Sequence, residues 1–253
     1  MNIRIRRFTA AAGVALFVLF IVSGIASATQ ISLLTPAGLN AGDHFRFAFV
    51  TSGSTAATAT DIQTYNDFVQ QQAGGATYDG AVVSWKAIGG SATVSARDNV
   101  GGFGTAVPVY LVNGTRIFQD MTGLPGGIWS YTLGIEAPLN VKIDGSSADA
   151  GNTWTGTGYR GGLANPGFLG DSYITVGRTD VTSSWYYYPN YPQSNLYPMF
   201  GISSELTVAA VPEIATSGLA SAAALTVGFL SLLERRRNRS VNPGERRPSM
   251  SRA

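Results

Sequence analysis

The sequence contains no cysteine and a single histidine, His44, among its 253 residues. The lack of cysteine excludes disulfide bonds, thiolate metal sites and cysteine nucleophiles. A lone histidine has no second imidazole with which to build a metal site, and no Ser-His-Asp arrangement is visible around it. Because His44 alternates with Phe45 in an extended pattern, we expect it to face solvent. We therefore expect neither a metal site nor a cofactor.

Charged residues are also few, at 13% of the chain, and they are unevenly placed. Residues 29–210 contain seven Lys and Arg against twelve Asp and Glu, a formal charge of −5, and the other basic residues gather at the two ends. A mildly acidic central region has no basic patch for nucleic acid, so we expect no nucleic-acid partner. Its length suits one domain with its own core.

The N-terminus has the order of an export signal: a positive segment, an apolar run and a small-x-small site. This order predicts a signal peptide over residues 1–28 that signal peptidase removes; an uncleaved anchor is the alternative. In both cases the positive-inside rule places the following residues outside the cytoplasm. The pieces are the arginines Arg4, Arg6 and Arg7, the apolar run 10–25, and the cleavage-site residues Ala26 and Ala28.

The C-terminal part, residues 211–239, also has three parts: a short Pro-Glu motif, an apolar stretch and a basic cluster. The apolar stretch has enough residues to cross a bilayer as a helix. The arginines that follow it act as a stop-transfer signal and hold that end in the cytoplasm. The parts are the motif Val211, Pro212 and Glu213, the stretch 214–233, and the cluster Arg235, Arg236, Arg237 and Arg239.

This three-part arrangement resembles the PEP-CTERM sorting signal. In that family an exosortase, an integral-membrane cysteine protease, recognises and cleaves the signal. Its members are associated with exopolysaccharide and the extracellular matrix of biofilm- or floc-forming Gram-negative bacteria. The chain departs from the family at Ile214, where a second proline is usual, and in the polar tail of residues 240–253. A permanent membrane anchor that is never processed is the alternative.

The exported region between these signals, residues 29–210, predicts short strands and one main helix. Phe45, Phe47 and Phe49 alternate with other residues and predict a strand. Helical spacing of apolar residues predicts a helix over about 60–73, started by a capping box of Thr60 and Gln63. Further strands are expected at 82–88, 174–177 and 206–209, and in a hairpin of 107–112 and 115–118 with a type I′ turn at Asn113-Gly114. A glycine-rich passage runs from 153 to 170.

The order of several short pieces resembles exported bacterial domains of the C-type-lectin-like fold. The resemblance implies an α+β fold, a single domain rich in short strands and loops; an all-β sandwich is the alternative. The sequence has neither the cysteines nor the Glu-Pro-Asn or Gln-Pro-Asp tripeptide of animal lectins, so calcium-dependent sugar binding is not implied. The pieces are 45–52, 61–62, 65–66, 68–69, 85–88, 96–99, 107–110 with 113–115, 154–157 and 195–197.

Five aromatic residues within the seven positions 185–191 form the most distinctive segment of this region. They cannot all enter one core, and amphipathic rings on a loop suit binding to sugars or to a protein. We expect Trp185 to be the most buried, and Tyr187 and Tyr191 to be exposed. The three together are the candidate ligand-binding residues. The alternative is a loop packed down by its own aromatics.

Three other patterns give weaker indications of function. A pair among the acidic residues could hydrolyse a glycosidic bond, but none has a signature spacing. The loop 144–151 could bind calcium, although it lacks the EF-hand order and reads as a solvated turn. The glycines of 101–104 are not followed by the residues of a phosphate-binding loop. The acidic residues considered are Asp98, Asp120, Asp144, Asp149 and Asp171.

Together these patterns predict an exported, non-enzymatic protein of the cell surface or extracellular matrix. Its expected partners are signal peptidase, an exosortase-type protease and extracellular polysaccharide. The exported domain would be structural or would bind a glycan or a protein. A secreted polysaccharide hydrolase and a permanently anchored surface protein are the alternatives.

Overall fold

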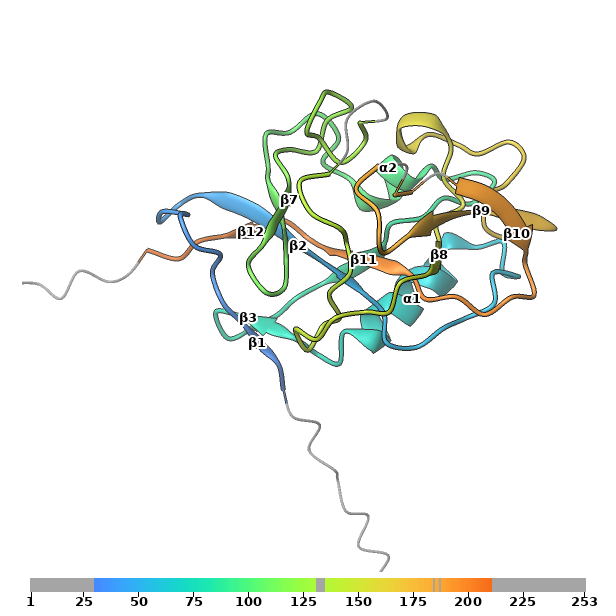
Figure 1. Cartoon of the computed structure of the whole chain (residues 1–253). Coiled ribbons are helices and arrows are strands. Elements are labelled where there is room, and N and C mark those ends of the chain that lie inside the picture. The colour runs from blue at the N-terminus through green and yellow to red at the C-terminus, as the bar shows by residue number, and fades with distance from the viewer. Residues whose placement is uncertain (1–29, 131–134, 184, 187, 211–253) are drawn as a thin grey trace, which may run out of the picture.

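The computed structural model describes residues 30–130, 135–183, 185–186 and 188–210. The predicted signal peptide, the sorting segment 211–239 and the tail 240–253 lie outside this part of the chain. Within the described part, no helix combines the length and the apolar character needed to cross a membrane. The described part is rich in short strands with few helices, as the sequence predicted, and Figure 1 shows long loops between them.

The largest sheet has the order β5-β11-β2-β6-β7, and β12 pairs with the start of β2. Strands β2 and β6 run parallel, and the other pairs in this sheet are antiparallel. The longest strand, β2, lies in the middle of the sheet, so its neighbours shield it on both sides. The bounds are β2 His44–Val50, β5 Trp85–Ala87, β6 Val109–Leu111, β7 Arg116–Phe118, β11 Phe200–Ser203 and β12 Leu206–Thr207.

Strand β2 confirms the predicted strand, but it is buried on both faces. Phe45, Phe47 and Phe49 enter one hydrophobic core, which includes residues of α1 (Ile62–Gln72). Ala48 enters a second core, built mainly from β6, β11 and the loops after β7. Only His44 at the strand's start is exposed. The alternation of the sequence therefore separates two cores rather than a core from solvent.

Helix α1 confirms the predicted helix, but its start differs. The N-cap is Asp61, whose carboxylate accepts a hydrogen bond from the amide of Gln63 at 3.0 Å. The side chain of Gln63 donates to Asp67 one turn later instead of reaching back, so the predicted capping box at Thr60 is wrong. A carboxylate is a strong N-cap acceptor beside the positive helix end, which favours Asp61 over its neighbour.

The helix seats closely on the sheet because Gly201 in β11 has no side chain. A Cβ on Gly201 would lie 2.5 Å from the ring of Phe49 and 2.7 Å from a methyl carbon of Val69. This close approach brings polar residues of α1 to the outer edge of β5. Figure 1 shows the helix beside this end of the sheet.

The outer edge of β5 is closed by side-chain amides instead of a further strand. Asn66 accepts a hydrogen bond from the amide of Ala87 at 2.9 Å, and Asn99 of α2 (Ala96–Val100) donates to the carbonyl of Ala87 at 2.8 Å. The two asparagines also bond to each other at 2.9 and 3.0 Å. One turn along α1, Gln70 accepts from the amide of Trp85 at 2.7 Å.

Two smaller sheets complete the described fold, with orders β10-β9-β8 and β1-β3-β4. Strand β9 confirms the strand expected at 174–177, whereas the strand expected at 82–88 is split between β4 and β5 of different sheets. The last strand is β12, which is shorter than the expected 206–209. The bounds are β1 Ser32–Leu33, β3 Thr77–Tyr78, β4 Ala81–Val82, β8 Asn152–Trp154, β9 Tyr173–Arg178 and β10 Tyr188–Pro192.

The β6–β7 hairpin forms as expected, but its turn is not type I′. Gly114 has φ +88°, whereas Asn113 is not among the described non-glycine residues with positive φ. The amide of Gly114 donates to the carbonyl of Leu111 at 2.8 Å, and Asn113 accepts from the amide of Thr115. This is the pattern of a type I turn followed by a left-handed glycine, and the register of the hairpin shifts at Val109/Tyr110.

Candidate functional site

The aromatic segment does not present Trp185 to a ligand. Trp185 is 2% exposed, as its size led us to expect, and its ring centroid lies 5.1 Å from that of Phe118 and 5.4 Å from that of Phe200. Tyr186 is 1% exposed beside it. The side chain of Tyr187 lies outside the described residues. In this part of the segment the rings pack into the second core, as in the alternative interpretation.

Tyr191 is half-buried rather than exposed, and it belongs to a short row of rings. Its centroid lies 5.8 Å from that of Tyr197, which in turn lies 4.8 Å from that of Trp154. The indole nitrogen of Trp154 donates to the carbonyl of Thr55 at 2.8 Å, so the innermost ring is fixed. Tyr197, which is also half-buried, is therefore the middle ring of the row.

Tyr197 lies at a polar pocket of about 300 Å³ between the loops 51–54 and 148–152. Sequence reasoning gave Tyr197 no role, and it missed the other residues because they come from distant loops. Hydroxyl, amide, ammonium and carboxylate groups are all present in this lining. The polar residues of the lining include Ser52, Ser54, Lys142, Asp149, Asn152 and Tyr197.

Two buried threonines hold the loops of the pocket in place. The hydroxyl of Thr51 donates to the carbonyl of Gly53 at 2.8 Å and accepts from the amide of Met199 at 2.9 Å. The hydroxyl of Thr179 donates to the carbonyl of Asp149 at 2.8 Å and accepts from the amide of Gly151 at 2.9 Å. Each hydroxyl replaces a backbone partner for its loop, so the pocket is largely preformed.

Two charged groups of the pocket remain available for a ligand. Within the described residues, the ammonium of Lys142 and the carboxylate of Asp149 form no ion pair. By contrast, Asp144 is used by its own turn. The hydroxyl and amide of Ser146 donate to it and hold the pKa of its carboxyl below the usual value. The predicted solvated turn at 144–151 is what the structure shows around Asp144.

The other acidic candidates also bond to their own loops. Asp98 is bonded to the hydroxyl of Ser95, Asp120 accepts from the amide of Thr122, and Asp171 accepts from the amide of Gly167. His44 is exposed, as predicted, and its Nδ1 lies 2.7 Å from a carboxylate oxygen of Glu205. Among the described residues, no group of three His, Asp or Glu side chains is placed to hold a metal ion.

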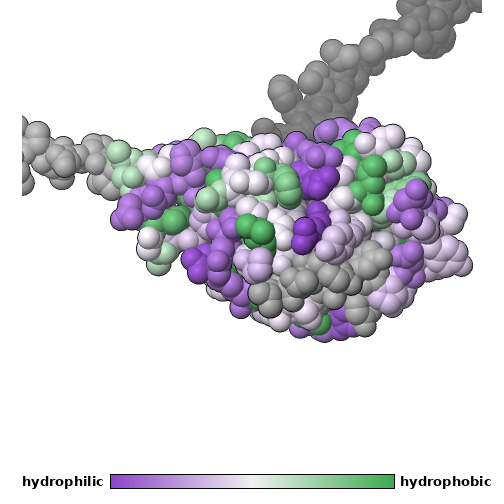
Figure 2. Space-filling view, turned by 90° about the horizontal axis from the view of Figure 1, so that it is seen from above, coloured by the Kyte–Doolittle hydropathy of each residue, from purple (hydrophilic) through white to green (hydrophobic). Residues whose placement is uncertain are grey.

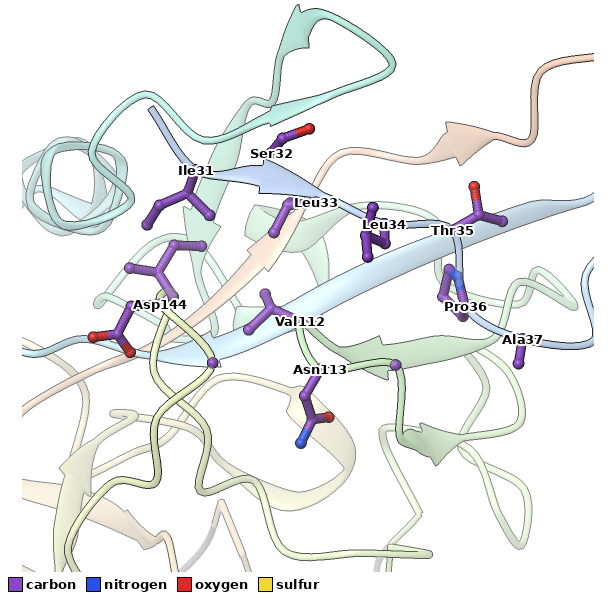
Figure 3. A pocket seen from close by; sticks show the side chains of 13 residues that line it. Ile31, Ser32, Leu33, Leu34, Thr35, Pro36, Ala37, Val112, Asn113 and Asp144 are labelled. Atoms are coloured by element: carbon purple, nitrogen blue, oxygen red, sulfur yellow. The ribbon is translucent and has the colours of Figure 1, made fainter. Parts of the chain in front are cut away.

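A second hollow, of about 400 Å³, is a groove beside β1 (Figure 3). Its lining is mainly aliphatic: Leu33 and Val112 lie on opposite sides in the close view, and Asn113 and Asp144 are among the few polar residues of the lining. It lacks the convergent polar groups that fix the orientation of a small ligand. We therefore take the pocket beside Tyr197 as the candidate functional site.

The site thus combines a partly exposed ring, neutral hydrogen-bonding groups and one charge of each sign. Such a mixture binds polyhydroxylated ligands, because hydroxyl groups both donate and accept hydrogen bonds. No protein-family model matches the chain, and no curated protein matches it. The residues of this site are therefore the indication of function that the described structure offers.

Proposed function

We propose that this protein is an exported, non-enzymatic component of the cell surface or extracellular matrix whose C-type-lectin-like domain binds polysaccharide at the Tyr197 pocket. The observation that carries the binding proposal is the preformed polar pocket beside Tyr197, the middle ring of a row of three aromatic rings. The strand-rich fold with one main helix supports the fold assignment. The proposed export and sorting of the protein rest on the N-terminal export signal and the PEP-CTERM-like C-terminal signal.

The chemistry of the pocket supports a sugar more than an apolar ligand. An aromatic ring covers the C–H face of a sugar, while hydroxyl and amide groups bond to its edge. Asn152 offers both a donor and an acceptor, and Lys142 offers a further donor with no competing carboxylate in an ion pair. The fixed loops reduce the entropy that binding must overcome.

A glycan array probed with the purified full-length chain tests the binding proposal. We expect Asn152→Ala and Lys142→Ala each to weaken binding about 10-fold, since each removes hydrogen bonds worth roughly 1.5 kcal/mol. Gln63→Ala, on the exposed face of α1, is the matched control and should bind as the unchanged protein does. Equal binding by all four proteins, or no glycan bound at all, would contradict the proposal.

Sorting is tested by the mass of the C-terminus in cells with and without an exosortase. We expect cleavage close to Val211-Pro212-Glu213 only when the exosortase is present, and loss of the cleavage in Pro212→Ala. An uncleaved tail in both strains would instead identify a permanent anchor. This test is independent of the glycan array, so delivery and binding can fail separately.

A further inference from the structure

We propose a second binding surface on this domain, built from two exposed arginine–aromatic pairs, that takes an acidic polysaccharide bearing carboxylate groups. The pairs are Arg97 with Phe103 and Arg160 with Tyr159. The surface is separate from the Tyr197 pocket and shares no lining residue with it. The proposal therefore stands or falls independently of that pocket.

The first pair lies at the end of α2. The guanidinium carbon of Arg97 is 5.2 Å from the ring centroid of Phe103, which is 50% exposed in a loop of glycines. A large apolar ring that is half in solvent gains little free energy from burial. Arg97 lies over this ring, and the side of the guanidinium that faces away from the ring stays open. The nearest acid in sequence, Asp98, is bonded to Ser95 and forms no ion pair with Arg97 in the described structure.

The second pair lies in the 3₁₀ turn η1 (Tyr159–Gly161). The guanidinium carbon of Arg160 is 5.3 Å from the ring centroid of Tyr159, which is 57% exposed. Gly161 packs directly against Trp129, because a Cβ there would lie 2.4 Å from the indole. This contact anchors the turn and leaves Tyr159 and Arg160 on the outside.

The backbone of Arg160 adds a further observation. Its φ is 54° and its ψ is 38°, the left-handed region that residues with a Cβ rarely adopt. Such conformations occur where the surrounding structure imposes them, and they gather at functional sites. The strained residue here carries an exposed charge without an ion pair among the described residues.

Contacts between loops bring the segments that carry the two pairs close together. The amide of Gly104, next to Phe103, donates to the carbonyl of Met121 at 3.2 Å. Two residues later, a Cβ on Gly123 would lie 3.6 Å from Cδ of Arg160. The η1 loop, yellow in Figure 1, lies at the top of that view. Figure 2 looks onto this side and shows hydrophobic and strongly hydrophilic residues interleaved, without one large apolar area.

The charge of the surface selects the ligand. Residues 29–210 carry a formal charge of −5, and the other arginines are paired or buried: Arg116 bonds to Glu136, Arg178 bonds to Asp180, and Arg46 is buried. Two unpaired guanidinium groups in these neighbouring segments are therefore a local exception. A guanidinium binds a carboxylate through two parallel hydrogen bonds, and the half-exposed ring of Phe103 beside Arg97 offers a stacking face to the sugar. In a uronic-acid chain, every sugar residue has both a carboxylate and a sugar ring.

Binding of the full-length chain to polygalacturonate, with neutral dextran as the comparison polymer, tests this proposal. We expect the double variant Arg97→Gln/Arg160→Gln to weaken binding to polygalacturonate at least 10-fold and to remove most of its salt dependence. Arg116→Gln removes an exposed arginine that is paired with Glu136, so it should bind as before. Gln63→Ala, on the exposed face of α1 and outside both proposed sites, should also leave polygalacturonate binding unchanged.

Arg160→Gly separates binding from folding. Glycine accepts the left-handed conformation without strain, so this variant should unfold at the same or a higher temperature while it binds polygalacturonate more weakly. Equal losses in the Arg116 variant and the double variant would reduce the effect to overall charge and overturn the proposal. Tighter binding to single-stranded DNA than to polygalacturonate would also overturn it, because stacked rings and arginines suit nucleic acids too.

Discussion

The outer edge of β5 and the outer edge of β1 show two opposite treatments of an unpaired strand. At β5, the amides of Asn66, Asn99 and Gln70 bond to the backbone that a further strand would have bonded. At β1, the amide of Thr77 in β3 donates to the carbonyl of Ile31, so the backbone of Ser32 points away from β3. No backbone hydrogen bond from another described residue reaches Ser32 on that side.

The side-chain amides of α1 can bond to the backbone of β5 because the spacing of residues along the helix matches their spacing along the strand. Asn66 and Gln70 are one helical turn apart, about 5.4 Å to 6 Å, and they bond to Ala87 and Trp85, two strand residues or about 6.6 Å apart. One face of α1 can therefore stand in for a strand. The segment 30–42, which contains β1, has no charged residue that would discourage pairing with another chain. Substitutions at the sealed edge of β5 should therefore lower stability, whereas substitutions at the open edge of β1 should change it little.

The largest effect is expected from Asn66→Ala. It leaves the amide of Ala87 and the side-chain oxygen of Asn99 without their hydrogen-bond partners on Asn66 in a buried place, which costs about 3 kcal/mol of unfolding free energy. Urea unfolding of the variant measures this cost. Gln63→Ala on the exposed face of the same helix should cost less than about 0.5 kcal/mol. Similar midpoints for the two variants would show that the edge does not depend on the amides.

Gly201→Ala should disrupt the same edge by displacing α1 from the sheet. The added methyl group meets Phe49 and Val69, both fully buried, so α1 must move away from the sheet. Overpacking of this kind costs about 2 kcal/mol. The variant should also raise hydrogen exchange at the amides of Trp85 and Ala87, whose partners lie on the displaced helix. A loss of stability without faster exchange at these two amides would separate core packing from the seal.

Stability at high pH should also depend on the helix of the sealed edge. Burial raises the pKa of Tyr65 to about 12, and its hydroxyl donates to the carbonyl of Ala59. The unfolded-state pKa is lower, so the neutral group stabilises the fold below pH about 10 and this contribution is lost as the pH rises towards 12. Tyr65→Phe should lose less stability over that range than the unchanged protein. Parallel pH profiles would contradict this assignment.

Local patterns predicted much of the fold because their causes are local. The alternation of Phe45, Phe47 and Phe49 gave β2, and the bulk of Trp185 indicated its burial. The hairpin at Asn113-Gly114 was located correctly, although its turn type follows from a register shift that the dipeptide does not encode. The helix was found, but the choice of Asp61 as its N-cap depends on competition between adjacent residues.

Non-local contacts account for what the sequence did not reveal. Asn66 is polar and lies on a helix, so its sequence pattern suggests an exposed face; it is buried only because β5 lies beside it. The Tyr197 pocket joins loops about 90 to 100 residues apart in the sequence, and Lys142 and Asn152 carry no motif that links them to Ser52. Arg160 is one arginine among glycines until its backbone conformation is known.

The smallest effect on stability, and the one that tests the open edge, is expected from Leu34→Lys. Leu34 is 78% exposed next to β1, so the change should alter the unfolding free energy by less than about 0.5 kcal/mol. An uncharged open strand pairs with other chains, and a lysine beside it opposes this pairing. Sedimentation velocity should therefore show less concentration-dependent association for this variant than for the unchanged protein. Leu196→Lys, at a leucine that is 67% exposed in a loop, is the matched control, and an equal reduction there would assign the effect to charge rather than to the edge of β1.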